Sequence, residues 1–170
     1  MDNINNMMFL ALREEGKLAI EGESLDDKHL NEIGLNDWNW GLTNKAPHRL
    51  KDKSGTKLSQ VEPIKVEKMF DKASTALAKY CALGKPIPEG TITCRKRDGD
   101  QMREYLTIEL RDIKVESVTW GAKGEDLRGI PETVELSFLK FSILYTMQDN
   151  DGHLLGVNTF DWDVAKHEEG

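Results

Sequence analysis

The sequence lacks the residue patterns that most metal sites need. It has two cysteines, Cys81 and Cys94, neither in a CxxC pair, and no HExxH motif, so a zinc site has little support. The segment "DNDG" at 149–152 is similar to the start of a calcium loop, but its twelfth position, which needs a carboxylate, is Phe160. We expect a tight turn there and no bound metal.

Catalytic motifs are missing as well. The sequence has no Gly-x-Ser-x-Gly, and the glycines of "GAKGEDLRG" at 121–129 lack the Lys-Ser/Thr ending of a phosphate-binding loop. Cys81 falls on the apolar side of a predicted helix, which is typical of a small core residue and not of an activated thiol. We expect no enzymatic activity and no cofactor.

Long hydrophobic runs and a basic N-terminus are also absent. The residue after Met1 is the acidic Asp2, and the first apolar run, 7–12, is too short for a signal peptide or a membrane span. These features predict a protein made in the cytoplasm without a secretory signal. Its thiols are expected to be reduced there, without a structural disulfide.

Positive charge is in deficit, with 23 Lys and Arg against 30 Asp and Glu and a formal net charge of −7. Nucleic acids and anionic membranes are therefore poor candidate partners, because both are bound through clustered basic residues. The hydrophobic share of 38% and charged share of 31% are typical of a soluble globular chain. We expect a single domain over residues 1–170, long enough to bury a core.

Alternation of apolar and polar residues with a period of two is the main pattern present, and it predicts strands. Trp38, Trp40 and Leu42 are expected on the core side of one strand, with Asn39 on the opposite face. Asp161 and Asp163 are expected to be solvated on the outer face of the last strand. Further inward positions are Ile64, Val66, Phe70, Ile92, Cys94, Phe160, Trp162 and Val164.

Two longer segments change the phase of this alternation near their middles. Between 105 and 120 the apolar residues are Leu106, Ile108 and Leu110, then Ile113 and Val115. Between 133 and 145 they are Val134, Leu136 and Phe138, then Leu139, Phe141, Ile143 and Tyr145. A strand changes its buried face only at a bulge or where its environment changes sides. Each segment therefore bends across the corner of a barrel, contributes to two sheets or is covered on both faces. These alternatives favour a mainly β fold that forms a compact barrel.

The segment "DKASTALAKYCALGKP" predicts one α-helix that flanks the sheets or plugs one end of the barrel. Asp71 or Ser74 can cap its N-terminus, and Gly84 suits its end. Its apolar face comprises Ala73, Ala76, Leu77, Tyr80 and Cys81.

A long loop at 44–60 is locally basic in an acidic chain. A loop of this length is usually functional or disordered. It contains one acidic residue, Asp52, and five basic ones, Lys45, Arg49, Lys51, Lys53 and Lys57. A short C-terminal tail, 165–170, is expected after the last strand.

The stretch "GESLDDKHLNE" places His29 among Glu23, Asp26, Asp27 and Glu32. These groups could form a metal site, an acid/base pair or a structural loop. The ligand set is weak for a metal, and the structural loop is favoured, since Ser and acidic side chains accept backbone N–H bonds in turns. In such a loop His29 is expected to pair with Glu23 or Glu32.

An ordered series of short motifs is similar to one known family. The series begins with Gly22-Glu23-Ser24, Asp26, His29, Glu32-Ile33 and Trp38-x-Trp40-Gly41, and continues through "FDKAS", "CALGKPIPEGTITCRK", "EYLTIEL", "ETVELSF" and "QDNDG". Over residues 7 to 164 it resembles the haemolysin-coregulated protein (Hcp) family, the tube component of bacterial type VI secretion systems.

The resemblance implies a non-enzymatic subunit with a β-barrel of two antiparallel sheets and one flanking α-helix. Such subunits form hexameric rings that stack into a tube, hold small effector proteins in the lumen and work with spike, sheath and baseplate proteins. They lie in the bacterial cytoplasm before firing and outside the cell afterwards. Members with a fused toxin extend well beyond the last strand, so this chain is expected to be a plain tube subunit.

The resemblance also implies roles for particular residues. Asn39 matches a position that lines the channel and influences effector holding. The 44–59 segment matches a loop that reaches an adjacent subunit or ring, although that loop is usually richer in Gly and Ser. Ring or stacking contacts are therefore expected at Lys45, Arg49, Lys51, Lys53 and Lys57.

Two other interpretations remain open from the residues alone. The first is a monomeric β-barrel that binds a small ligand, although the dense inward set of large apolar residues favours a filled core. The second is an enzyme that uses His29 and its neighbouring acids.

Overall fold

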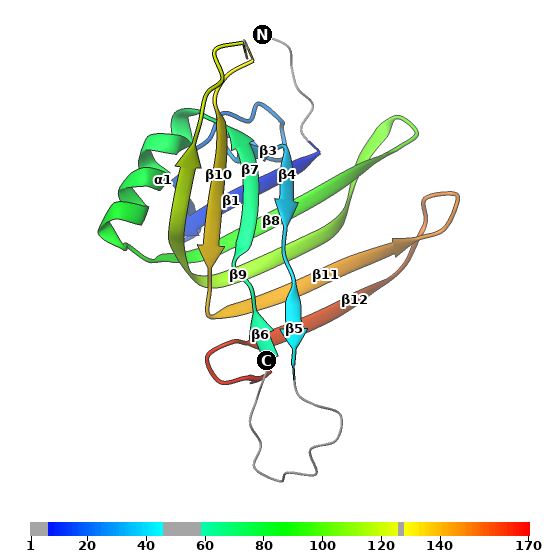
Figure 1. Cartoon of the computed structure of the whole chain (residues 1–170). Helices are drawn as coiled ribbons and strands as arrows, with labels where there is room; N and C mark the ends of the chain where they lie inside the picture. The colour runs from blue at the N-terminus through cyan, green and yellow to red at the C-terminus, as the bar shows by residue number, and fades with distance from the viewer. Residues whose placement is uncertain (1–6, 46–58, 126–127) are drawn as a thin grey trace.

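Strands and one helix account for most of the chain in a computed structural model that describes residues 7–45, 59–125 and 128–170 (Figure 1). The helix, α1, spans Lys72–Leu83. The strands within these ranges are β1 (Met8–Glu14), β2 (Lys17–Ile20), β3 (Ile33–Leu35), β4 (Asp37–Asn39), β5 (Leu42–Asn44), β6 (Ser59–Val61), β7 (Ile64–Met69), β8 (Ile87–Asp98), β9 (Gln101–Trp120), β10 (Pro131–Ser137), β11 (Lys140–Gln148), β12 (Leu154–Asp163) and β13 (Glu168–Glu169).

The pairings are antiparallel and form two main sheets that share β9. Sheet A runs β13-β12-β11-β9-β8-β1, and β1 also pairs with β2 and β3. Sheet B runs β4-β7-β10-β9. In Figure 1 the strands of sheet B cross those of sheet A steeply, α1 lies to one side, and the small β5–β6 ladder extends from sheet B.

β9 explains the first change of phase, and the prediction that it serves two sheets is confirmed. Its first part pairs with β8 and β11 in sheet A, and its last part pairs with β10 in sheet B. Asp112 lies between these parts with φ 53°, a left-handed conformation that Asp tolerates better than most residues. Leu110 and Ile113 on either side are both buried, so the bend carries the apolar pattern from one sheet to the other.

The second change of phase has a related but different cause. Residues 133–145 do not form one strand: β10 in sheet B ends at Ser137, and β11 in sheet A begins at Lys140. Phe138 is buried at the junction, whereas Leu139 and Tyr145, predicted to point inward, are 49% and 44% exposed.

The expected mainly β fold with two antiparallel sheets and one helix is confirmed, but the pairing does not close into a barrel. Among the described residues, β3 pairs only with β1 and β4 only with β7. The interruption lies at Asn36, whose backbone N–H donates to the Glu67 carbonyl oxygen. Residues 33–39 thus pass from one sheet to the other without a continuous ladder.

Side chains from both sheets and α1 fill the space between the sheets. The buried apolar cluster comprises Leu10, Leu12, Ile20, Ile33, Leu35, Ile64, Val66, Ala73, Leu77, Ile87, Ile92, Cys94, Ile108, Leu110, Ile113, Val115, Val134, Leu136, Phe138 and Phe141. Trp38, Trp40, Trp162 and Val164 pack against it while partly buried. A core filled in this way does not favour the interpretation of a barrel with an internal ligand site.

Four further predicted orientations are wrong, including that of Phe160, which was expected to point inward and is 39% exposed. Lys68, not Phe70, is the third inward residue of β7 after Ile64 and Val66, and Phe70 is 43% exposed. Leu42 is 44% exposed because β5 leaves sheet B to pair with β6. Asp163 is buried at 5% exposure, since its carboxylate accepts the backbone N–H of Lys166 and lies near the Lys140 ammonium.

The helix forms as its end signals predict. The Asp71 carboxylate accepts the backbone N–H of Ala73, and the Ser74 hydroxyl accepts the backbone N–H of Asp71, which together make a capping box. Gly84 ends the helix with φ 61° and donates to the Cys81 and Tyr80 carbonyls. The buried residues Ala73, Ser74 and Leu77 face the core, so α1 flanks the sheets.

The C-terminal residues 165–170, expected to be a tail after the last strand, include a further short strand. Glu168 and Glu169 form β13, which pairs with Asp163 and Trp162 at the end of β12. No helix within the described residues is long and apolar enough to cross a membrane.

Candidate functional site

The outward face of sheet B carries Asn39, the residue that the sequence places on the side opposite the core. β4 presents Asn39 exposed, while its neighbours Trp38 and Trp40 are partly buried against the core. The register continues the row across the sheet, because Asn39 pairs with Lys65, Lys65 with Glu135, and Glu135 with Ser117. We call these four residues the Asn39 row.

The contacts along this row are polar. The Lys65 ammonium lies 3.6 Å from the Glu135 carboxylate, and the Ser117 hydroxyl donates to the same carboxylate at 3.1 Å. The next row, Asp37, Glu67, Thr133 and Thr119, is also polar and half-buried to exposed. The eight side chains include three acids and one base, so this face is hydrophilic and mildly acidic. It suits contact with water or with polar surfaces.

Sequence reasoning found Asn39 but missed its three row partners. Lys65 and Glu135 are outward residues of the alternating segments "IKVEKM" and "TVEL", so the alternation gives the face of each one separately. Ser117 lies in "VESVT", where a β-bulge interrupts the alternation and turns Ser117 to the same face. The pairing register of four strands that are distant in sequence is what brings the residues together. Period-two patterns do not specify that register.

Of the five basic residues predicted to make ring or stacking contacts, the structure describes only Lys45. Lys45 is exposed, directly after β5. Arg49, Lys51, Lys53 and Lys57 lie outside the described residues.

His29 lies at the centre of a buried polar cluster that ties the 22–32 loop to the sheets. Its Nδ1 is 2.7 Å from one Glu32 oxygen, and its Nε2 is 2.9 Å from Glu104 on β9. The other Glu32 oxygen accepts from the Arg13 guanidinium at 2.9 Å. Of the two expected partners, Glu23 and Glu32, it is Glu32 that pairs with His29. Glu23 instead accepts the backbone N–H of Lys72 at the start of α1.

Aromatic packing fixes the imidazole in place. The Phe9 ring stacks on His29 with ring centroids 4.2 Å apart and an angle of 7° between the planes. The Arg95 guanidinium lies 4.6 Å from the Phe9 ring centroid and 2.8 Å from the Asp26 carboxylate. Both imidazole nitrogens and one face of the ring are therefore in contact with groups of the same chain, as a structural loop requires, and this favours neither the metal site nor the acid/base pair.

The carboxylates around His29 set its protonation. Burial disfavours the charged imidazole, but hydrogen bonds and charges from Glu32 and then Glu104 outweigh it and raise the pKa of His29 above 6.5. A protonated imidazole donates from both nitrogens and so satisfies both carboxylates, whereas a neutral one donates from only one.

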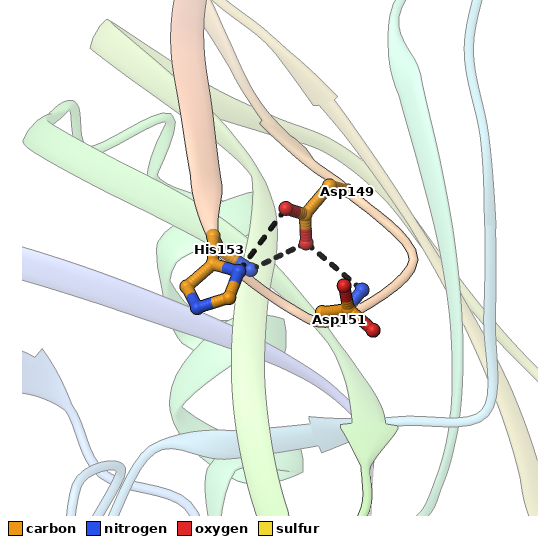
Figure 2. A group of neighbouring side chains, drawn as sticks. All are labelled: Asp149, Asp151 and His153. Atoms are coloured by element: carbon orange, nitrogen blue, oxygen red, sulfur yellow. Dashed lines mark hydrogen bonds and ion pairs between the residues drawn. The ribbon is translucent and has the colours of Figure 1, made fainter.

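The "DNDG" segment forms the turn between β11 and β12 (Figure 2). Asp149, Asp151 and His153 are the only group of three or more potential metal ligands found among the described residues. The Asp149 carboxylate is already used by the turn, because it accepts the backbone N–H groups of Asp151 and His153 at 2.9 and 2.8 Å. These bonds, led by the one from His153, lower the pKa of the Asp149 carboxyl. The arrangement is that of a hydrogen-bonded turn.

A surface cavity of about 290 Å³ lies on sheet A and involves both predicted outer acids of β12. Its lining includes Glu109, Arg111, Lys140, Asp161 and Asp163. The cations are engaged by acids of the same sheet, since Arg111 pairs with Glu89 and Lys140 lies 3.5 Å from Asp163. The lining also includes the core residue Phe141, with Trp162 and Gly170.

Comparisons with known proteins agree with this fold and with the motif series. The family model described as "Type VI secretion system effector, Hcp" matches residues 9–145. The protein hcp1 of Pseudomonas aeruginosa is 32% identical over 149 residues, which cover 87% of this chain and 91% of that protein. The crystal structure of Hcp1 from Salmonella typhimurium has a TM-score of 0.76 at 32% identity and covers 96% of this chain and 97% of its own. A type VI secretion system effector from Yersinia pestis has a TM-score of 0.72 at 32% identity, covering 92% of this chain and 99% of its own.

These matches extend over most of the chain and include both sheets and the helix. The family is one of structural secretion proteins and not of enzymes. The chain belongs to the Hcp family of type VI secretion system proteins.

Proposed function

We propose that this Hcp protein is the structural subunit of a type VI secretion inner tube. Copies form hexameric rings that stack into a conduit, and small effector proteins are held in the lumen and exported with it. The protein acts without catalysis, in contact with spike, sheath and baseplate proteins. It resides in the bacterial cytoplasm until firing delivers it outside the cell.

The outward face of sheet B is the observation that carries this proposal. All eight residues of its two central rows are polar, while the other side of the same sheet contributes Val66, Val134 and Leu136 to the core. A face of this kind suits the wall of a water-filled channel through which folded proteins pass. In the proposed ring this face borders the lumen, with Asn39 among the residues that contact cargo.

Charge places a condition on such a ring. Each copy carries a net charge of −7, so neighbouring copies repel unless their contacts are neutral or locally complementary. The basic residues Lys45, Arg49, Lys51, Lys53 and Lys57 are proposed to dock on an acidic part of a neighbouring copy or ring. Charge reversal at Lys51, Lys53 and Lys57 tests this step, and unaltered ring and tube formation would contradict it.

The experiment that tests the main proposal is a mass measurement in solution with parallel negative-stain electron microscopy. A mass of six subunits and annular particles are expected over a wide concentration range. A protein that stays monomeric at high concentration would overturn the proposal and restore the interpretation of a solitary ligand-binding domain.

A further inference from the structure

The hairpin of β11 and β12 carries no charge over most of the length of both strands. Residues 141–148 and 154–160, "FSILYTMQ" and "LLGVNTF", contain no Asp, Glu, Lys or Arg, although 31% of the whole chain is charged. Asp149 and Asp151 lie in the turn between the two segments, and Lys140, Asp161 and Asp163 lie at the base of the hairpin. We call these two segments the uncharged arm. Figure 1 shows the arm projecting to one side of the sheets.

The β12 side of the arm contributes little to the core of its own chain. Every residue from Leu154 to Phe160 is exposed, apart from the half-buried Gly156. The large apolar residues of the arm are nevertheless prominent on this surface. Their exposed fractions are 68% for Leu154, 62% for Leu155, 58% for Val157, 44% for Tyr145 and 39% for Phe160.

The arm also presents an open backbone edge. β12 pairs with β11 along one side, but among the described residues its other side is bonded only near its end, where β13 pairs with Trp162 and Asp163 and the Gly170 N–H donates to the Asp161 carbonyl oxygen. Natural edge strands are normally protected by charge, proline or shortness. β2 carries Lys17, β4 has three residues and carries Asp37, and β13 is two glutamates. From Leu154 to Phe160, β12 has none of these protections, and its one interruption is a β-bulge at Leu155, next to the turn, so its pairing with β11 is regular from Gly156 onward.

We propose that the uncharged arm is a contact surface between copies of this chain, centred on Leu155 and Val157 of β12. This inference rests on the proposed function and identifies a part of the chain through which the subunits join. A long, uncharged and apolar edge strand makes a monomeric protein prone to aggregation. Burial against a partner removes both the exposed apolar area and the unpaired edge.

The net charge of the chain favours a second copy as the partner that covers the arm. Because every copy is acidic, most of its surface repels an identical partner, and the arm is a surface that brings no charge into the contact. The aromatic packing supports a rigid contact. Phe160 lies 5.6 Å from the buried Phe141 and 6.0 Å from Trp162, measured between ring centroids, so the base of the arm is anchored to the core.

Symmetry fixes the type of contact in a ring. A ring of more than two identical subunits needs head-to-tail contacts, in which one patch meets a different patch on the next copy. The arm of one subunit therefore packs on another surface of its neighbour and not on that neighbour's arm. A two-fold dimer through paired β12 edges is the competing arrangement.

The test compares substitutions in the arm of the full chain by sedimentation equilibrium. Val157→Lys and Val157→Asp are each expected to raise the concentration of half-assembly at least about tenfold, because either charge must be buried in an apolar contact. Val157→Ile is expected to assemble like the wild type. The matched control is Leu83→Lys, which places the same charge at an exposed leucine at the end of α1. Circular dichroism and melting temperatures establish that the variants fold.

The outcomes separate this inference from the proposed function. If the wild type assembles and Val157→Lys and Val157→Asp assemble equally well, the arm is not the contact, and the tube proposal stands. If the wild type is monomeric, the tube proposal fails and the inference fails with it. A wild type that stops at a dimer dissociated by Val157→Lys would contradict the head-to-tail contact and assign the arm to a two-fold interface.

Discussion

The Lys68 ammonium nitrogen lies 2.7 Å from a Glu132 carboxylate oxygen, and neither side chain is exposed to solvent. The same ammonium donates to Asp71 at 2.7 Å, and the Ser74 hydroxyl donates to the Glu132 carboxylate at 3.1 Å. Trp120 donates its indole N–H to the other Glu132 oxygen. This buried cluster joins β7, β9 and β10 of sheet B to the N-terminus of α1.

Removal of one charge from this cluster should be strongly destabilising. Lys68→Met leaves the Glu132 carboxylate buried without its counter-ion, and a loss of about 3–5 kcal/mol in the free energy of unfolding is expected. Lys65→Met is a matched control, since Lys65 lies on the same strand and also faces a β10 glutamate, but in an exposed pair. Its loss should be about 0–1 kcal/mol. Urea unfolding at matched assembly states measures both, and equal losses would contradict the role assigned to the buried pair.

The His29 cluster predicts that stability depends on pH near neutrality. The folded-state pKa of His29 is raised above 6.5, so its stabilising contribution is complete below that value and is lost as pH rises through the folded-state pKa. The melting temperature should therefore contain a component that falls as the pH rises from about 6.5 through the folded-state pKa of His29.

Two variants isolate that component. His29→Gln should remove it. Glu104→Gln should reduce it, because one of the two carboxylates that favour the charged imidazole is lost while the Glu32 contact at 2.7 Å remains. His153→Gln is the control, since that histidine is exposed in the β11–β12 turn. An identical pH profile in the wild type and His29→Gln would show that the cluster does not couple to folding.

Much of the fold could be predicted from the sequence where the determining interactions are local. The helix boundaries follow from Asp71, Ser74 and Gly84, which act within one turn of the residues they cap. The change of phase in β9 reflects a bend at Asp112, inside the same strand. Partners distant in sequence were not predictable in this way. The burial of Lys68 depends on Glu132, which the register of β7 and β10 places opposite it.

In the candidate sites, too, local contacts could be predicted from the sequence and contacts between distant residues could not. The partner of His29 within the loop, Glu32, was among the two expected, whereas Glu104 is 75 residues away and comes from β9. Asn39 could be assigned to the outward face because its neighbours Trp38 and Trp40 alternate with it. The row that surrounds it and the exposure of the uncharged arm arise only when strands from distant parts of the chain pair.

Gly22 is expected to be essential for the conformation of the 22–32 loop. A β-carbon at this position would lie 2.5 Å from the Glu32 carbonyl oxygen and 2.8 Å from the Ile33 α-carbon, both backbone atoms that cannot move independently. Gly22→Ala should cost about 1–3 kcal/mol of unfolding free energy, the usual range for overpacking. Gly121→Ala is the control, because nothing lies within 4 Å of its added β-carbon. A thermal melt of each variant decides, and equal stability of the two would show that the loop adjusts freely.

Asn39 gives the most direct test of the proposed lumen. Its side chain is exposed on the face of sheet B opposite Trp38 and Trp40, so a larger side chain there has space and should leave folding and ring formation unchanged. Asn39→Trp and Asn39→Lys are expected to reduce the amount of a co-expressed cognate effector that copurifies with the assembled protein, because the contact surface of the channel changes. Thr75→Trp, on an exposed position of α1, serves as the control for a bulky surface residue. Normal effector retention in both Asn39 variants would remove this residue from the cargo surface, and loss of the rings would mean that this face of sheet B meets another subunit and not the lumen.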